Sequence, residues 1–326
     1  ITYCMAPIVA TQPSWFYVMV VVTVLLLTEL KHTFTEFAQR MKNDEMITLA
    51  KFLAISGIIL PMLPHKNLLP DVNLTPYSIW LATVVVSGIS YLSYLLKRYV
   101  FHESGTLVSG IIGGLYSSTA TISVLARKSR KASEQEATDY VAAMLLAISM
   151  MFLRFMILIL IFSREIFLSI YPYLLTMAVV AAIVAWFIHS RQKRSNDQPV
   201  EAEEDDSSNP LEFKVALIFA VLFVVFTFLT HYTLVYAGTG GLNLLSFVSG
   251  FSDITPFILN LLQNTGSVAA LIITACSMQA IISNIMVNMF YALFFAGKGS
   301  KLRPWILGGF GVVIACNLVL LLFFYI

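Results

Sequence analysis

The chain has 326 residues, of which 58% are apolar and only 12% charged, and its mean hydropathy is +0.83. Water-soluble domains average roughly 45–50% apolar and about 25% charged residues. This composition, with a formal net charge of only +2, excludes a soluble enzyme, a nucleic-acid-binding protein and a disordered chain as the main class. It predicts an all-α polytopic membrane protein.

Apolar runs of roughly 18 residues or more mark membrane-spanning helices. We predict spans at residues 14–30, 47–63, 77–96, 138–163, 166–189, 212–236, 267–296 and 303–326. The charged segment 31–46 is expected to form an interfacial helix. Because the sequence begins at Ile1 and not at a methionine, we also expect an N-terminal part to be missing from it.

Two further apolar segments, 105–126 and 240–262, are broken near their middle. Glycine followed by hydroxyl or acidic residues interrupts them at 113–119 and 249–256. Glycine costs about 1 kcal/mol relative to alanine inside a helix, and Ser and Asp favour helix caps. Each segment is therefore predicted to be a helical hairpin that enters the membrane and returns to the side from which it came.

The distribution of Lys and Arg supports this interpretation. Cytoplasmic loops of membrane proteins are enriched in these residues. If both broken segments crossed the membrane, the basic loops would divide almost evenly between its two sides. If both re-enter, all Lys and Arg residues except Lys66, Arg154 and Arg164 share the cytoplasmic side. The sequence thus predicts about eight spans and two re-entrant hairpins, which enter from opposite sides.

The two hairpins also resemble each other. At an offset of 136 residues, Gly105 aligns with Gly241, Gly114 with Gly250, Ser117 with Asp253 and Thr119 with Thr255. In the following span, Ser149 and Arg154 align with Ser283 and Asn288 at an offset of 134. Each unit would contain three spans and one hairpin, so the second copy would be inverted, as in many secondary transporters.

This repeat divides the chain into five predicted parts. They are an N-terminal part at 1–46, a connecting span with an outer loop at 47–76, repeat 1 at 77–190, a polar cytoplasmic linker at 191–211 and repeat 2 at 212–326.

The hairpin tips carry the candidate binding chemistry. Ser117, Ser118 and Thr119 can cap the returning helix of the first hairpin, and Ser252 or Asp253 can do the same in the second. Helix N-termini suit an anion, whereas Asp253, the carboxylate at a tip, favours a cation or a transferable proton. Purely structural capping is the alternative for the hydroxyl groups.

Arg154 lies inside an apolar span and needs a partner there. Asp253 is one candidate; the alternative is that Arg154 binds hairpin carbonyls or extends to the interface. Asn284 and Asn288 share a helix face and could coordinate an ion or hold helices together. The candidate binding residues are Ser117, Ser118, Thr119, Thr121, Arg154, Ser252, Asp253, Thr255, Asn284 and Asn288, with Asp253 as the best single candidate for a metal ligand.

Several motifs resemble the membrane domain of the DUF4010 family, a domain of unknown function. They are the runs 74–80, 87–90, 110–121, 151–154 and 209–212, and Ser283-Asn284. The resemblance covers about residues 47–326. It implies that residues before about 45 are the end of an MgtC/SapB-like module, and that the protein is linked to ion homeostasis. Thr255 and Asn288 stand where related sequences tend to have an acidic and a basic residue, respectively.

We therefore expect a transporter or channel of the bacterial inner membrane, related to magnesium homeostasis through this resemblance. The expected substrate is a small inorganic ion bound between the tips, because the sequence shows no aromatic-lined pocket, and Asp253 favours a cation. The alternative is a regulator that binds another membrane complex, with hairpin tips fully paired by protein. No catalytic motif or nucleophile–base pair appears, so no enzyme activity and no cofactor are expected. The expected partners are the lipid bilayer and the ion, with a homo-oligomer left open and no nucleic acid.

Overall fold

The computed structural model describes residues 21–22, 24–25, 28, 43–68, 72, 74–101, 105–130, 134–191, 213–263, 269–297 and 302–325. The chain divides into two units, residues 1–53 and residues 54–326. The second unit contains the candidate site and is described below. The predicted span at 14–30, most of the predicted interfacial helix at 31–46 and nearly all of the linker at 191–211 lie outside the described residues.

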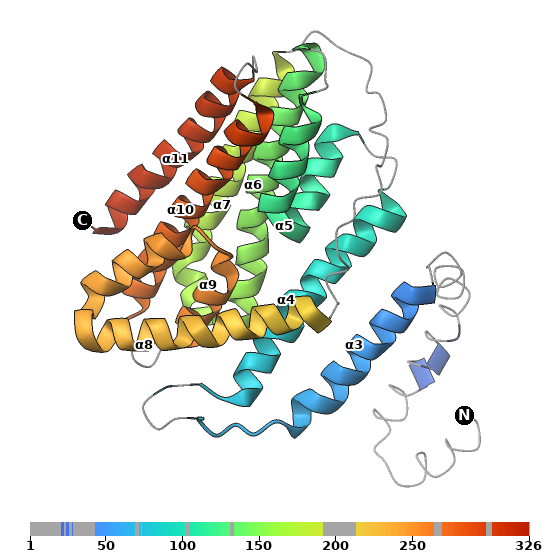
Figure 1. Cartoon of the computed structure of the whole chain (residues 1–326), viewed down its shortest axis with the longest axis vertical. Coiled ribbons are helices and arrows are strands. Elements are labelled where there is room, and N and C mark those ends of the chain that lie inside the picture. The colour runs from blue at the N-terminus through green and yellow to red at the C-terminus, as the bar shows by residue number, and fades with distance from the viewer. Residues whose placement is uncertain are drawn as a thin grey trace. The chain divides into compact units, whose positions relative to one another are not determined.

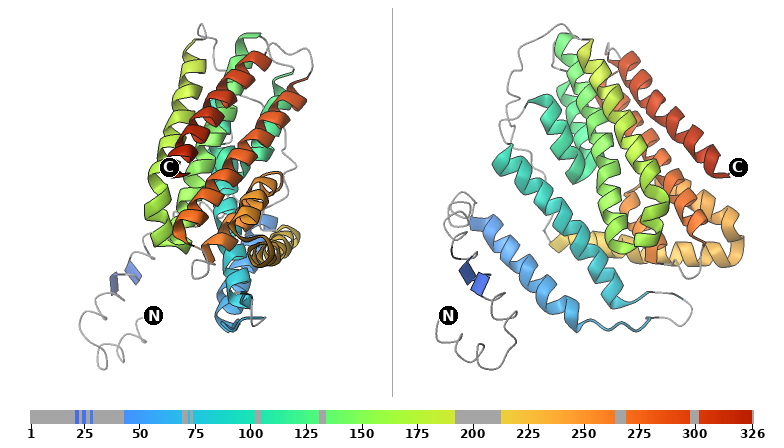
Figure 2. Two further views of the ribbon diagram at one scale, coloured as in Figure 1. Left: turned by 90° about the vertical axis from the view of Figure 1, so that its left-hand side faces the viewer. Right: turned by 180° about the vertical axis from the view of Figure 1, so that it is seen from behind.

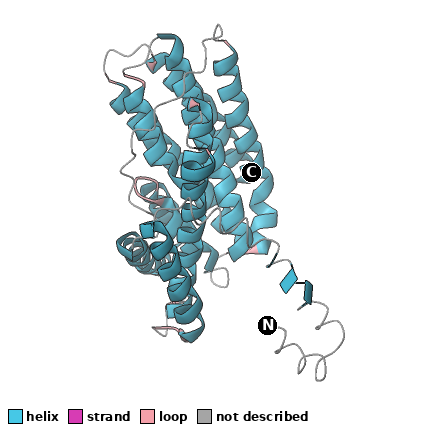
Figure 3. Cartoon of the chain, turned by 90° about the vertical axis from the view of Figure 1, so that its right-hand side faces the viewer, coloured by secondary structure: helices cyan, strands magenta, loops and turns pink. Residues whose placement is uncertain are grey.

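The described residues form helices joined by loops (Figures 1 and 3). The helices are α3 (Asn43–Met62), α4 (Pro76–Leu95), a π-helical turn (Leu96–Val100), α5 (Thr106–Lys128), α6 (Glu134–Phe162), α7 (Arg164–Ser190), α8 (Phe213–Ser249), α9 (Ile254–Gln263), α10 (Ala270–Ala296) and α11 (Arg303–Tyr325). Among these described helices, eight are long and apolar enough to cross a membrane. The predicted all-α, multi-pass membrane fold is therefore confirmed.

The helix boundaries agree with the sequence prediction within a few residues for most spans. Two helices differ, because α5 and α8 extend through positions at which the sequence predicts a change of direction. Both contain a residue with non-helical backbone angles, Ser117 in α5 and Gly238 in α8. Gly238 has a φ of 59°, a conformation that glycine adopts readily, and it separates the predicted span at 212–236 from the predicted hairpin at 240–262.

Local capping chemistry explains where two of the spans begin. Thr75 and Ser78 form a capping box at the start of α4, in which each side chain binds the other's backbone N–H, and Pro76 occupies the first helical position. Ser163 accepts a hydrogen bond from the Ile166 backbone N–H at the start of α7 (3.3 Å). Because Ser163 alone separates α6 from α7, these helices are tightly joined antiparallel neighbours.

Small residues allow α5 to approach α6 closely. Gly110 and Gly114, one helical turn apart, face Ala143 and Ala147 of α6. A methyl group added to Gly114 would lie 2.5 Å from the Ala147 Cα atom, so the two backbones are nearly in contact. Membrane helices commonly associate through such small-xxx-small pairs, since lipid supplies no hydrophobic driving force between helices.

The buried core lies where α6, α7, α10 and α11 pack side by side (Figure 2). Phe152, Ile148, Ile281 and Phe310 are fully buried there, at 0% exposure. α5 and α9 pack against this group of four helices, and α8 crosses α4 (Figure 1). The two helix breaks of α5 and of the α8–α9 segment are held against this core.

A polar cavity between two helix breaks

The first helix break reverses the direction of the chain. Ser117 has an extended backbone (φ −158°, ψ 109°) between two helical arms of α5. A Cβ atom added to Gly113 would lie 2.5 Å from the Thr121 Oγ1 atom. In a straight helix, residues eight positions apart are separated by about 12 Å along the axis. The two arms of α5 therefore fold back on each other, and Thr121 lies between them.

Ser117 caps the returning arm, as the sequence predicts. Its Oγ atom accepts a hydrogen bond from the Ala120 backbone N–H (3.3 Å). This is the usual N-cap arrangement, in which a hydroxyl oxygen satisfies a backbone donor at the start of a helix.

The second break is a turn of four residues, 250–253, between α8 and α9. The Asp253 Oδ1 atom accepts a hydrogen bond from the Thr255 backbone N–H (2.9 Å), and Pro256 lies in the first turn of α9. The Ser252 hydroxyl instead donates to the Ser249 carbonyl (3.1 Å). Of the two predicted caps, Asp253 is therefore the one that forms.

Both breaks line the same cavity, whose volume is about 420 Å³. Residues of α4, α5, α6, α8, α9 and α10 contribute to its wall, together with the turn between α8 and α9. Its polar lining consists of Ser87, Ser90, Tyr116, Ser117, Ser118, Thr119, Arg154, Ser252, Asp253, Thr255, Asn284 and Tyr291. Eight of the ten predicted site residues are thus brought together; Thr121 and Asn288 do not line the cavity.

Arg154 binds the first break. Its guanidinium donates to the Tyr116 backbone carbonyl (2.8 Å) and to the Ser90 Oγ atom (3.4 Å). No ion pair joins Arg154 to Asp253 among the described residues, although both side chains line the cavity. The binding of a hairpin carbonyl, the alternative to a direct ion pair with Asp253, is what the structure has.

Neutral side chains of α10 bind the second break. Ser283 donates to the Phe247 carbonyl (2.7 Å), and the Asn284 Nδ2 atom donates to the Gly250 carbonyl (3.2 Å). Asn288 in turn donates to the Asn284 Oδ1 atom (3.1 Å). The amide oxygen of Asn284 thus accepts one hydrogen bond from Asn288, which lies outside the cavity lining and acts as a positioning residue.

Sequence reasoning missed two groups of lining residues. In the sequence, Ser87 and Ser90 of α4 are interpreted only as small residues that allow close packing. Their spacing nonetheless places both hydroxyl groups on one helix face, and both line the cavity. The second group is aromatic: no aromatic-lined pocket is recognisable in the sequence, yet five aromatic residues line the cavity, namely Tyr116, Phe155, Phe219, Phe251 and Tyr291. These residues come from different segments, and each segment alone is unremarkable in a membrane protein.

Asp253 is the one acidic residue in the cavity lining among the described residues. In the described part of the chain, no group of three or more His, Cys, Asp or Glu side chains is arranged to hold a metal ion. A cation bound beside Asp253 would therefore depend on hydroxyl, carbonyl and water oxygens for its remaining ligands.

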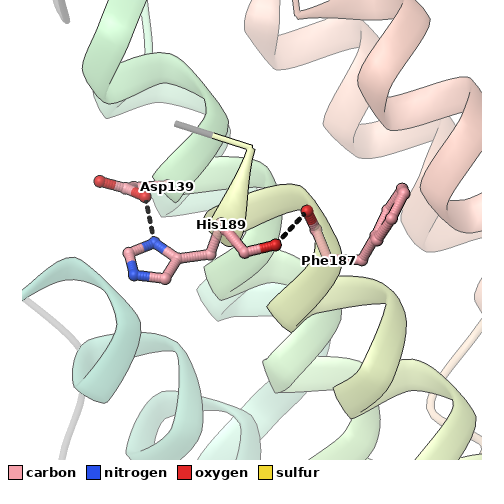
Figure 4. Close-up of polar contacts among 4 residues, drawn as sticks. Asp139, Phe187 and His189 are labelled. Carbon is pink, nitrogen blue, oxygen red and sulfur yellow. Dashed lines mark hydrogen bonds and ion pairs between the residues drawn. The ribbon is translucent and has the colours of Figure 1, made fainter. Parts of the chain in front are cut away.

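A second polar contact lies outside the cavity, where α6 begins and α7 ends (Figure 4). The His189 Nδ1 atom is 2.7 Å from the Asp139 Oδ1 atom, and the Ser190 hydroxyl donates to the Phe187 carbonyl (3.0 Å). Neither Asp139 nor His189 lines the cavity. This pair fastens two helix ends together and offers a carboxylate for control substitutions.

Comparisons with known proteins identify the family. The class defined by the fold is a multi-pass helical membrane protein with a polar cavity between two helix breaks. Residues 84–296 match the family described as Domain of unknown function (DUF4010), and the chain belongs to that family. It is also 25% identical over 224 residues to an uncharacterized protein of Aquifex aeolicus (strain VF5), which covers 68% of this chain and 96% of that protein. No solved structure matches the chain.

Proposed function

We propose that this protein transports a small charged solute across a membrane and that the cavity between the two helix breaks is its binding site. One observation carries the proposal: two helix breaks, from distant parts of the chain, meet at a cavity that contains one basic and one acidic side chain. Irregular backbone within a membrane is tolerated where it is buried in protein or lines a water-filled cavity. Transporters characteristically bind their substrates at such broken helices.

The lengths of the hairpin arms support a re-entrant arrangement. The arm from Thr106 to Tyr116 spans about 16 Å, which is half of the roughly 30 Å needed to cross a bilayer. Because the two arms of α5 run antiparallel, Thr106 and Lys128 lie at the same end of the hairpin. Lys97 precedes the first arm and Arg127 ends the second, so their basic side chains would share the cytoplasmic side.

The packing supports an inverted repeat. Gly110 packs on Ala143 and Gly114 on Ala147, while Ser246 bonds to Gln279 and Gly250 packs on Ser283. The two pairs of contacts match residue by residue at a constant offset of 136: positions 110, 114, 143 and 147 correspond to positions 246, 250, 279 and 283. This displacement equals the offset of 136 expected for the hairpins and differs from the offset of 134 expected for the spans that follow them.

Contacts between the two repeats are reciprocal as well. α5 packs on α10, and its counterpart α9 packs on α6; likewise α10 packs on α7, and α11 on α6. α4 contacts α8, and α7 contacts α11, which are contacts between equivalent helices. A two-fold relation between the repeats accounts for all of these contacts, and rocking of one repeat against the other would open the cavity to each side in turn.

The finer expectations from the sequence belong to this proposal. They are an inorganic ion as substrate, with a cation favoured by Asp253, the bacterial inner membrane as location, cytoplasmic basic loops, a connection to MgtC-like modules and no enzyme activity. A regulator without transport activity would need tips that are fully paired by protein. The cavity of about 420 Å³ that both tips line favours transport over such a regulator.

Uptake into proteoliposomes tests the proposal. The full chain is reconstituted, and the uptake of rubidium, magnesium, chloride and small amino acids is measured against empty liposomes. We expect at least one of these solutes to enter, and Asp253→Asn to lower its uptake at least about tenfold, because a charged partner of the solute contributes about 1.5–3 kcal/mol. Asp139→Asn, the matched control outside the cavity, should leave uptake unchanged. Uptake of every solute at the level of empty liposomes would contradict the proposal.

A further inference from the structure

The two charged side chains of the cavity interact with different helix breaks: Arg154, from α6, with the first, and Asp253 with the second. Arg154 is bound to the Tyr116 carbonyl at the first break (2.8 Å), and Asp253 caps α9 at the second. No ion pair connects them in the described part of the chain. Arg154, a partly buried cation inside an apolar helix, needs an ionic or strongly polar partner there, whereas Asp253 is exposed. The cavity therefore presents a positive pole at one tip and a negative pole at the other.

Both poles have unused hydrogen-bonding capacity. Arg154 is partly exposed and lines the cavity, and its two terminal nitrogens, which carry two N–H groups each, donate one hydrogen bond each. Asp253 is exposed, and Thr255 alone donates to its carboxylate among the described residues, through a single bond to Oδ1. The Asn284 amide oxygen, a further acceptor, already accepts one hydrogen bond from Asn288. Each pole can thus bind one complementary charged group of a solute.

The size and the walls of the cavity favour an organic solute. Small-molecule sites have volumes of about 300–1,000 Å³, and this cavity, at about 420 Å³, is much larger than a single dehydrated ion. Five aromatic side chains line it, including Tyr116 at the first break and Phe251 at the second. Aromatic rings pack against hydrocarbon and attract organic ammonium groups through their faces.

We propose that the substrate is a small zwitterion of the size and charge pattern of an α-amino acid. Its carboxylate would bind Arg154 at the first break, its ammonium group would bind Asp253 at the second, and its side chain would face the aromatic wall. This inference rests on the proposed transport function and names the class of substrate. It differs from the inorganic cation expected from the sequence, in which no aromatic-lined pocket is recognisable.

Calorimetric titration of the purified full chain in lipid nanodiscs tests the inference. Glycine, L-alanine and L-serine carry both charges, acetate carries only the carboxylate, and methylammonium carries only the ammonium group. Potassium chloride and magnesium chloride represent inorganic ions. We expect at least one of the amino acids to bind at least about tenfold more tightly than acetate and methylammonium, since each of these lacks one charged contact.

Substitutions at the two poles should act selectively. Asp253→Asn keeps a good capping residue, and it should weaken binding of the amino acid at least about tenfold while leaving acetate binding unchanged. Arg154→Gln should weaken binding of both the amino acid and acetate. Asp139→Asn and Arg164→Gln remove the same charges elsewhere, at a contact outside the cavity and at an exposed position, and should change neither. If Arg154→Gln does not fold, two measurements still test the inference: the effect of Asp253→Asn, and the binding of the different ligands to the wild-type protein.

Two outcomes would overturn the inference. One is that acetate binds as tightly as every amino acid and Asp253→Asn changes nothing, which would indicate an anion site. The other is that an inorganic salt binds while no amino acid does. Either outcome, together with uptake of an inorganic ion into proteoliposomes, would leave the proposed transport function standing. The absence of uptake of any solute would remove that function too, so the two failures are distinguishable.

Discussion

At both helix breaks, side chains bind the backbone groups that the interrupted helix leaves unpaired, but the charged side chain is basic at the first break and acidic at the second. At the first, a neutral hydroxyl caps the returning helix, and the charged Arg154 binds the carbonyl that ends the preceding arm. At the second, the charged Asp253 caps the following helix, and the neutral Asn284 binds the carbonyl of Gly250. Every break leaves backbone donors and acceptors that must be satisfied. The same scaffold therefore places a positive charge at one tip and a negative charge at the other.

The way in which each tip is held differs as well. At the first, the glycine of the arm faces backbone: a methyl on Gly114 would lie 2.5 Å from the Ala147 Cα and 2.7 Å from its carbonyl oxygen. At the second, the two atoms nearest to a methyl on the equivalent Gly250 belong to the side chain of Ser283, at 2.3 and 2.4 Å, and the Asn284 backbone nitrogen follows at 2.8 Å. A clash against backbone cannot be relieved by shortening a side chain, whereas a clash against a side chain can. This difference separates the two tips experimentally.

The largest effect is expected from Gly114→Ala. The new methyl group would force α5 and α6 apart, at a cost of about 3 kcal/mol in the free energy of unfolding, and the midpoint of thermal unfolding in detergent should fall accordingly. Gly308→Ala in α11 is the matched control, because nothing lies within 4 Å of the position of its added methyl. An equal midpoint for the two variants would mean that the α5–α6 contact is not tight.

A smaller effect is expected from Gly250→Ala, and this one should be partly reversible. Combining it with Ser283→Gly removes the two atoms nearest to the new methyl group, Cβ and Oγ, and leaves the Asn284 backbone nitrogen at 2.8 Å. The double variant should therefore unfold at a higher temperature than Gly250→Ala alone, although it loses the bond from Ser283 to the Phe247 carbonyl. Additive losses in the two variants would show that the second tip is held by backbone contact like the first.

Removing a capping side chain and removing only its charge should affect stability differently. Asp253→Ala removes the acceptor for the Thr255 N–H and should cost about 1 kcal/mol of stability, as should Ser117→Ala at the first break. Asp253→Asn keeps a capping oxygen and should change stability by less than about 0.5 kcal/mol. Thermal unfolding separates these cases. A large loss in Asp253→Asn would mean that its charge is needed for folding and is not reserved for a solute.

A stabilising effect is expected from Gly240→Ala in the arm of α8 after Gly238. Nothing lies within 4 Å of the position of its added methyl, so the substitution should stabilise the protein by up to about 1 kcal/mol through helix propensity alone. Thermal unfolding against wild type measures this. A decrease in the midpoint of thermal unfolding would contradict the prediction and would indicate a close neighbour at this position.

Local chemistry made much of this architecture predictable. Apolar runs predict the spans, and the breaks at Ser117 and before α9 follow from residues that cap helices better than they continue them. The contacts between distant segments were harder to predict from the sequence, because they depend on which helices pack together. The partners of Arg154, namely Ser90 and Tyr116, are distant in sequence, and the aromatic wall is assembled from several segments. No single segment carries a signal for such a wall.

Cysteine accessibility in oriented membranes tests the re-entrant arrangement most directly. After replacement of the native cysteines, single cysteines at Lys97, Arg127 and Tyr236 are treated with a membrane-impermeant thiol reagent from each side. If both broken segments re-enter, positions 97 and 127 react from the same side, and position 236, at the base of the second hairpin, reacts from the other. Reaction of positions 97 and 127 from opposite sides would mean that α5 crosses the membrane, and the proposed cavity between two re-entrant tips would be wrong.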